Sequence, residues 1–273
     1  MKNRLDQSAG IVVGANSYVG LALFRELQSR GATRLVGTFL PRDRDTGVGI
    51  DEVSRHMSGL TDFTAMELDQ TDDEQVKTVI REAQETMNGL DLLVTAASLQ
   101  SEKAHLAMSF EEMCAQVQVN LLGTMNVIRH AVNKMISLTA IESPQFNHRS
   151  IGVVASIRGL EPLVAQTYDA AKAGLVHHVR ALSTQIGQYG ISINAVAPGT
   201  IDCPIEYVRH GCSQVEYQQR WAPLTPYGGT PVTPEDVAEE LVHLMNSGSV
   251  TGHTVPVDGG FSQMRPLPQR KAD

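Results

Sequence analysis

Short apolar runs alternate with segments of helical periodicity from residue 10 to the end of this chain. This alternation constrains the fold more than any other feature, because continuous apolar strands between helices are typical of a parallel sheet covered on both faces. We expect strands over residues 11–14, 34–40, 63–68, 90–95, 151–155, 192–197 and 253–257. The expected architecture is α/β, a doubly wound parallel sheet of seven strands.

Signals for helix ends lie between these runs. Thr71-Asp72-Asp73-Glu74 predicts a capping box, and Ser109 and Thr233 each begin a later helix in the same way. Two segments interrupt the alternation: a polar connection over residues 138–150 and a substrate loop over residues 199–232, which glycines and prolines punctuate. Because no linker, repeat or low-complexity tract is present, we expect residues 1–273 to form a single domain.

Composition excludes several classes of protein. No apolar stretch approaches the roughly 20 residues of a membrane helix, and the N-terminus lacks the apolar core of a signal peptide, so we expect a cytoplasmic protein. A net charge of −8 argues against nucleic acid and against an anionic membrane surface as partners. Cys114, Cys203 and Cys212 match no common zinc spacing, and we therefore expect reduced thiols and no metal site.

A glycine turn over residues 14–20 joins the first expected strand to the first helix. In a Rossmann-type sheet, such a turn lets backbone N–H groups and the helix N-terminus approach a pyrophosphate. Two glycines alone are a weak signal, and the position in the first βα unit is what supports a nucleotide site. The candidate cofactor contacts in this turn are Gly14, Asn16, Ser17, Tyr18, Val19 and Gly20.

The residues after the second expected strand bear on the choice of dinucleotide. An acid at that strand tip binds the ribose 2′-hydroxyl of NAD, whereas an arginine accommodates the 2′-phosphate of NADP. No acid stands near Leu40, and Arg42 and Arg44 follow, which favours NADP. Asp43 and Asp45 keep NAD open, because a strand that ended a residue or two later would bring an aspartate to the ribose.

Tyr168 and Lys172 are four residues apart on an expected helix and so project from one face. A free tyrosine has a pKa of about 10 and is only ~0.1% phenolate at neutral pH, but a nearby ammonium favours the phenolate. Such a tyrosine can exchange a proton with a substrate oxygen. A Y-x-x-x-K pair alone is most often a chance surface pair. Ser156, at the tip of the fifth expected strand where ligands of such sheets bind, is what indicates a catalytic site.

The order of these motifs resembles the short-chain dehydrogenase/reductase family over roughly residues 8–262. Further matches are Leu68-Asp69, Thr95-Ala96-Ala97-Ser98 in place of an N-N-A-G signature, Asn120, Asn194-Ala195-Val196-Ala197-Pro198-Gly199 and Val257-Asp258-Gly259-Gly260. The resemblance implies that Tyr168 is the acid/base and that Lys172 lowers its pKa and binds the nicotinamide ribose. It further implies that Ser156 holds the substrate oxygen and that Asn120 supports a water-borne proton path to Lys172. The other implied cofactor contacts are Asp69, Ala96, Ala97, Pro198, Gly199 and Ile201.

The chain departs from the family pattern in three places. Tyr18 or, in the pattern of the longer relatives, Ser17 replaces the middle glycine of the turn. The N-N-A-G signature has lost both asparagines and its glycine. Ser156 precedes Tyr168 by 12 positions (168 − 156), one fewer than we expect for this family. None of these departures removes a catalytic residue.

The expected function is an NADP(H)-dependent oxidoreductase that interconverts a ketone and a secondary alcohol on a small apolar or ring-bearing metabolite, in a biosynthetic pathway. Apolar and aromatic residues of the loop suit such a substrate or pack on one another: Ile201, Ile205, Tyr207, Val208, Tyr217, Trp221 and Leu224. One alternative is a 3-oxoacyl-carrier-protein reductase, which the net charge of −8 disfavours because an acidic carrier must dock. Another is a catalytically silent relative that binds nucleotide as a sensor or scaffold. The altered glycine turn counts slightly for it, and the intact set of Asn120, Ser156, Tyr168 and Lys172 counts against it.

The resemblance also implies assembly, because the family pairs the helices that carry Asn120 and Tyr168 across a two-fold axis. We expect Met113, Val117, Met125 and Ile128 to expose a second apolar face there. Large apolar patches seldom stay in water, so a homodimer or homotetramer is expected.

The double change Arg42→Ala, Arg44→Ala tests the choice of dinucleotide. Each guanidinium can pair with a 2′-phosphate, and one such charge-assisted hydrogen bond is worth about 1.5–3 kcal/mol. We expect KM for NADPH to rise about tenfold or more while KM for NADH stays nearly unchanged. If the unmodified protein has an equal or higher kcat/KM with NADH, the aspartates meet the ribose instead.

Overall fold

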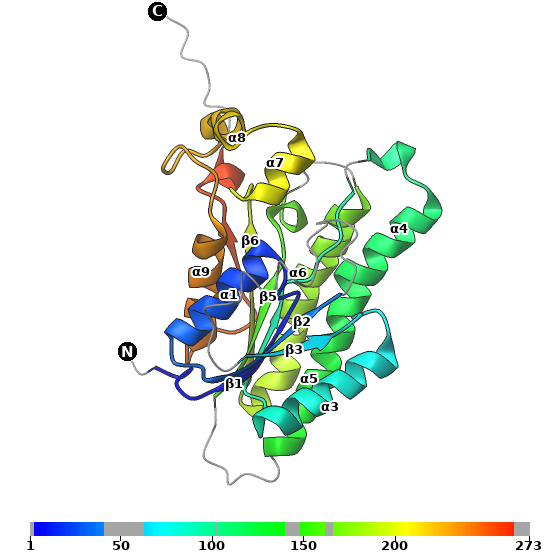
Figure 1. The fold of residues 1–273 in the computed structure, drawn as a ribbon, viewed down its shortest axis with the longest axis vertical. Helices are drawn as coiled ribbons and strands as arrows, with labels where there is room; N and C mark the ends of the chain where they lie inside the picture. The colour runs from blue at the N-terminus through cyan, green and yellow to red at the C-terminus, as the bar shows by residue number, and fades with distance from the viewer. Residues whose placement is uncertain (1–2, 41–62, 102, 140–147, 162–165, 265–273) are drawn as a thin grey trace, which may run out of the picture.

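The structure, a computed structural model, describes residues 3–40, 63–101, 103–139, 148–161 and 166–264. Seven strands form one parallel sheet in the order β3-β2-β1-β4-β5-β6-β7, which confirms the expected doubly wound architecture (Figure 1). The strands are β1 (Ala9–Val13), β2 (Arg34–Phe39), β3 (Phe63–Glu67), β4 (Leu92–Thr95), β5 (Arg149–Val154), β6 (Ile191–Pro198) and β7 (Thr254–Val257). The central strands β1 and β4 are buried along their whole length, as their continuous apolar runs predict.

Helices cover both faces of the sheet. The longer ones are α1 (Tyr18–Ser29), α3 (Asp73–Met87), α5 (Thr124–Thr139), α6 (Thr167–Ile186) and α9 (Pro234–Asn246). The shorter ones are α4 (Phe110–Val117), α7 (Pro204–His210), α8 (Gln214–Trp221), a π-helix η2 (Gln118–Gly123) and the 3₁₀ turns η1 (His105–Ala107), η3 (Ile157–Gly159), η4 (Gly187–Tyr189), η5 (Ala222–Leu224) and η6 (Phe261–Gln263). One apolar core packs α3, α5 and α6 on one face, and a second packs α1 and α9 on the other (Figure 1).

Two of the three expected helix starts are confirmed. Ser109 and Thr233 each cap a helix with a complete capping box, and Pro234 occupies the first turn of α9. The expectation at Thr71 is wrong by one residue, because the Asp72 carboxylate accepts the Gln75 N–H and makes Asp72 the N-cap of α3. A carboxylate caps as well as a hydroxyl does, so adjacent threonine and aspartate leave the start ambiguous in sequence.

Residues 199–232, the expected substrate loop, are only partly a loop. They contain α7 and α8, which lie beyond the carboxyl ends of the strands (Figure 1). The rings of Tyr207, Tyr217 and Trp221 pack edge-on or tilted against one another and His210, with Tyr207 and Tyr217 centroids 5.4 Å apart. These three rings therefore pack on one another. The polar connection begins later than expected, because α5 continues to Thr139.

The expected second apolar face near Asn120 is partly corrected. Ile128 is buried in the core of its own chain, because α5 turns that residue toward the sheet. Met113, Val117 and Met125 remain half-exposed, and Leu122 and Phe110 are exposed beside them in the chain. No helix in the described part of the chain is long and apolar enough to cross a membrane.

Candidate active site

The expected catalytic side chains meet at the carboxyl edge of the sheet. Tyr168 lies in the first turn of α6, and Lys172 lies one turn later on the same face, with its Nζ 5.5 Å from the centroid of the tyrosine ring. Lys172 is only 2% exposed, and its Nζ donates a 3.1 Å hydrogen bond to the carbonyl of Val154, the last residue of β5. Ser156 follows two residues later, also buried. A strand tip and a helix start thus bring these three residues to one place.

Asn120 lies in the π-helix η2 and is completely buried. Its side-chain amide donates to the carbonyls of Leu99 (2.6 Å) and Gln116 (3.0 Å), and its Oδ1 accepts from the Ser98 hydroxyl and the Leu99 N–H. The side chain therefore ties η2 to the segment that follows β4. π-Bulges are frequent at functional sites. The expected proton path to Lys172 would depend on a backbone group and a water, since the side chain is already engaged.

The glycine turn lies between β1 and α1 and depends on close backbone packing. Gly14 has φ +80°, and a Cβ there would lie 2.6 Å from the Ala97 nitrogen, so the turn touches the segment after β4 directly. A Cβ on Gly20 would lie 2.1 Å from the Gly14 carbonyl oxygen. Both positions therefore need glycine, because the backbone of the turn packs closely on itself and on Ala97.

The altered middle position of this turn has a local explanation. Ser17 is the N-cap of α1: its hydroxyl accepts the Gly20 N–H at 3.0 Å and donates to the Gly14 carbonyl at 2.9 Å. Tyr18 is the first helical residue and does not have a positive φ. Neither position needs glycine here, because the serine side chain closes the turn. No acidic residue occupies the first turn of α1, which suits an anion at this N-terminus.

The other expected cofactor contacts lie along the same edge. Ala96 donates its N–H to the Val13 carbonyl at 2.8 Å, which holds the segment after β4 against β1. Gly199 follows β6, and its N–H donates to the Val257 carbonyl at 2.9 Å. Ile201 forms a parallel bridge with Val232. The remaining ones are Asn16, Val19 and Pro198, which continue the same strand ends and turns. Arg42 and Arg44 lie outside the described residues.

Asp69 lies where the third strand ends, half-buried. Its Oδ1 accepts from both the backbone N–H (2.9 Å) and the hydroxyl (2.7 Å) of Thr71, so the carboxylate shapes the turn into α3. Asn194 of the N-A-V-A-P-G motif has a structural role, since its buried amide bonds the Val250 carbonyl and the His253 N–H and holds the chain before β7.

A family model described as "Enoyl-(Acyl carrier protein) reductase" matches residues 14–262, which is most of the chain. The chain is a short-chain dehydrogenase/reductase. It is 28% identical over 262 residues to the 3-oxoacyl-[acyl-carrier-protein] reductase FabG of Thermotoga maritima, covering 94% of this chain and 99% of that one. It is 26% identical over 268 residues to a (+)-cis,trans-nepetalactol synthase of Nepeta racemosa, covering 96% and 93%. The crystal structure of gox2181 superposes with a TM-score of 0.80 at 26% identity, covering 96% and 99%.

Short-chain dehydrogenases/reductases use NAD(P), act on small-molecule substrates and are often oligomers. The relatives of this oxidoreductase carry the names of different reactions, a carrier-protein reductase and a nepetalactol synthase. Similar chains of this family therefore differ in the reactions that their names give.

One residue of the site carries no signal in the sequence. The guanidinium carbon of Arg158, in η3, lies 4.8 Å from the centroid of the Tyr168 ring. The backbone N–H of Arg158 also donates to the Ser156 hydroxyl at 3.2 Å. An arginine in a turn usually points into water, and only the packing of η3 on α6 places this one at the site.

Two other tyrosines near this edge are poor candidates for the acid/base. Burial raises the pKa of Tyr207, and a hydrogen bond that its hydroxyl donates to Asp202 raises it further. Burial likewise raises the pKa of Tyr217. Burial and the neighbouring Glu206 charge raise the pKa of the Cys203 thiol to about 12, so it stays protonated. These groups keep their protons near neutral pH.

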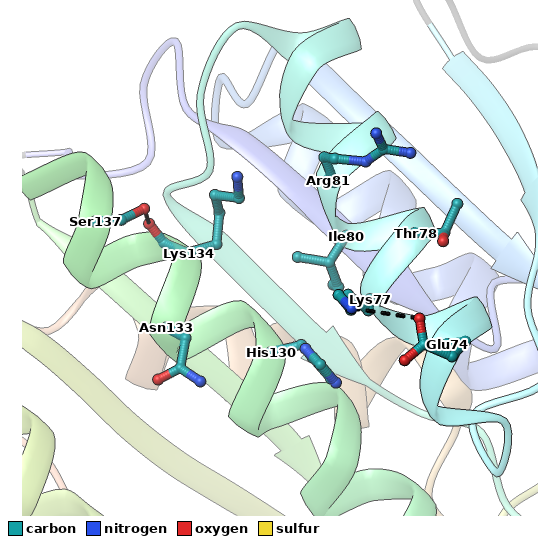
Figure 2. A pocket seen from close by; sticks show the side chains of 9 residues that line it. All are labelled: Glu74, Lys77, Thr78, Ile80, Arg81, His130, Asn133, Lys134 and Ser137. Carbon is teal, nitrogen blue, oxygen red and sulfur yellow. Dashed lines mark hydrogen bonds and ion pairs between the residues drawn. The ribbon is translucent and has the colours of Figure 1, made fainter.

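No group of three or more metal-ligating side chains is present among the residues that the structure describes. A hollow between α3 and α5 is a separate feature, shown in Figure 2. Its lining includes Lys77, Arg81, Lys134 and His130, and Lys77 pairs with Glu74 at 3.3 Å. It shares no residue with the site around Tyr168.

We expect Gly14→Ala to weaken NAD(P)H binding about tenfold or more, because backbone strain of this kind costs of order 1–3 kcal/mol and the added Cβ meets Ala97. Gly187→Ala is the matched control, since a Cβ there has no heavy atom within 4 Å. Fluorescence titration measures the dinucleotide Kd of each variant, and thermal unfolding shows that each variant is folded. An unchanged Kd in a folded Gly14→Ala protein would place the dinucleotide elsewhere.

Proposed function

We propose that this chain, as a single domain, is an NADP(H)-dependent oxidoreductase that interconverts a ketone and a secondary alcohol on a small apolar or ring-bearing metabolite. The observation that carries the proposal is the buried Lys172 ammonium beside the Tyr168 ring, with Ser156 at the adjacent strand tip. A buried cation beside a phenol favours the phenolate, which is what an acid/base tyrosine needs near neutral pH.

In this reaction each side chain has a distinct task. The Tyr168 hydroxyl gives its proton to the carbonyl oxygen during reduction and takes it back from the alcohol during oxidation. The Ser156 hydroxyl donates a hydrogen bond to the same oxygen and orients it. Lys172 uses one N–H on Val154 and has two more donors for the cofactor's ribose and a water. The nicotinamide supplies or accepts the hydride when bound.

The cofactor-binding part of the proposal rests on the edge of the sheet between β1 and β4. Here the strand order reverses, and dinucleotides bind at such switch points. Gly14, Ser17 and Gly20 shape the pyrophosphate cradle, with Asn16, Tyr18 and Val19 completing the turn. Ala96 and Ala97 border the cradle from β4, Asp69 faces the adenine, and Pro198, Gly199 and Ile201 border the nicotinamide. Arg42 and Arg44 select NADP by their charge.

A 3-oxoacyl-carrier-protein reductase is the second candidate. The support for it is the names of several relatives, including the Thermotoga maritima and Mus musculus proteins, the latter 31% identical over 243 residues. The net charge of −8 opposes it, because an acidic carrier protein would be repelled. Parallel assays with an acyl-carrier-protein thioester and a panel of free ketones distinguish the two. A catalytically silent relative has less support, because Ser17 closes the altered turn.

Tyr168→Phe tests the assignment of the acid/base. We expect turnover to fall about 10²–10⁴-fold while the dinucleotide Kd stays nearly unchanged, because the ring still packs and only the proton-exchanging oxygen is lost. Lys172→Ala should reduce both turnover and dinucleotide affinity. Stopped-flow kinetics and fluorescence titration separate these effects. A Tyr168→Phe protein that keeps more than about a tenth of kcat would overturn the assignment.

Assembly into a two-fold dimer or tetramer is part of the proposal. The half-exposed Met113, Val117 and Met125 and the exposed Phe110 and Leu122 need cover from water, and a second copy of the same helices supplies it. Light scattering at micromolar concentration should therefore give a mass of two or four chains. A monomer under those conditions would contradict the proposal.

A further inference from the structure

Two cations flank the Tyr168 ring, and they come from different elements. The Arg158 guanidinium carbon lies 4.8 Å from the ring centroid and the Lys172 Nζ lies 5.5 Å from it. The Arg158 side chain is only 15% exposed, so water screens its charge incompletely. The tyrosine is thus subject to a second positive charge besides that of Lys172.

Hydrogen bonds hold Arg158 in this position. Its Nε donates to Asp169 Oδ1 at 2.6 Å, and its Nη2 donates to Gln166 Oε1 at 2.5 Å. Gln166 in turn donates to the Lys103 carbonyl at 2.8 Å, which connects the start of α6 to the segment before α4. With its backbone N–H on the Ser156 hydroxyl, Arg158 contacts both residues that would touch the substrate oxygen.

We propose that Arg158 is a positioning residue for Tyr168, and that its charge supports the phenolate to an extent that Asp169 limits. The inference rests on the proposed role of Tyr168 as the acid/base. A guanidinium over an aromatic face is attracted by the ring quadrupole, which fixes the ring plane. The same positive charge favours a negative phenol oxygen, and the carboxylate of Asp169 offsets part of it because the two form an ion pair.

Other charged groups lie along α6, on the elements around it, and at the exposed Glu161 that follows η3. Along α6 itself, His177, His178 and Arg180 follow Tyr168 by at least two helical turns. η2 and β6 carry no charged residue. α4 carries Glu111, Glu112 and Cys114, with Glu112 paired to Lys103, and α5 carries Arg129 and His130, both paired with Asp73, and Lys134. Arg149 lies at the opposite end of β5. Arg158 and Lys172 lie over the Tyr168 ring and Asp169 pairs with Arg158, so these are the groups whose removal should act on Tyr168.

The test uses two substitutions that remove opposite charges. Arg158→Met removes the cation, and Asp169→Asn removes the carboxylate but keeps an oxygen acceptor for the Arg158 Nε. In the direction of alcohol oxidation, where Tyr168 acts as base, we expect the half-maximal pH of kcat/KM to rise by about 0.5 unit or more for Arg158→Met and to fall for Asp169→Asn. Arg158→Lys, which keeps the charge, should stay near the unmodified protein. If Arg158 had only a structural role, these variants would have a lower rate, but their half-maximal pH values would not shift in opposite directions.

Arg180→Met is the matched control, because it removes the same charge from the exposed far part of α6 and should leave the profile unchanged. The ionisation is also measured without substrate, as tyrosinate absorbance of each protein minus that of the same protein carrying Tyr168→Phe. If Arg158→Met and Asp169→Asn are folded and shift the half-maximal pH equally, or not at all, the role of Arg158 is overturned. Retained turnover of Tyr168→Phe would instead overturn the proposed function, while the absorbance titration still decides whether Arg158 acts on the phenol.

Discussion

Parallel pairing of every neighbouring strand is the constraint on which the candidate site depends. Because all seven strands run the same way, their carboxyl ends meet at one edge. Gly14 after β1, Ala97 after β4, Ser156 after β5 and Gly199 after β6 are thereby neighbours along that edge, although they span most of the chain. An antiparallel strand among β1, β4, β5 and β6 would send its terminal residue to the opposite edge. The site is therefore a consequence of the strand direction as much as of the side chains.

Backbone contacts define the end of this edge that is proposed to bind the nucleotide. Ala97 lies against Gly14 so closely that no Cβ fits, and Gly20 meets the Gly14 carbonyl. The Ser17 hydroxyl supplies the hydrogen bonds that close the turn. This arrangement explains why a tyrosine is tolerated at position 18, where the family pattern has glycine. Tyr18 is the first residue of α1, and the close contacts of the turn are made by the backbone of its glycines.

The proposed catalytic end contains two cations that are removed from most of the solvent. A buried charge is costly unless polar groups compensate it, and each cation has such a group nearby: the Val154 carbonyl for Lys172 and the Asp169 carboxylate for Arg158. These partners leave both positive charges close to the Tyr168 ring. The contacts that compensate the burial cost of the two cations also hold them near the proposed acid/base. Stability and proposed chemistry thus share one set of interactions.

The local sequence pattern was sufficient to predict features that lie within one helix or strand. The alternation of apolar runs and helical periods determined the sheet and its helices, and the four-residue spacing of Tyr168 and Lys172 determined their common face. The Ser213–Glu216 capping box of α8 and the proline and glycine at the two ends of α7 are local signals as well, although residues 199–232 were expected to be a loop. The local pattern was not sufficient where two elements meet. That Ile128 faces the core and that Arg158 lies on Tyr168 were decided only by tertiary packing. The physical reason is that periodicity reports the neighbours of a residue along its own helix or strand, whereas the partner that buries it comes from another part of the chain.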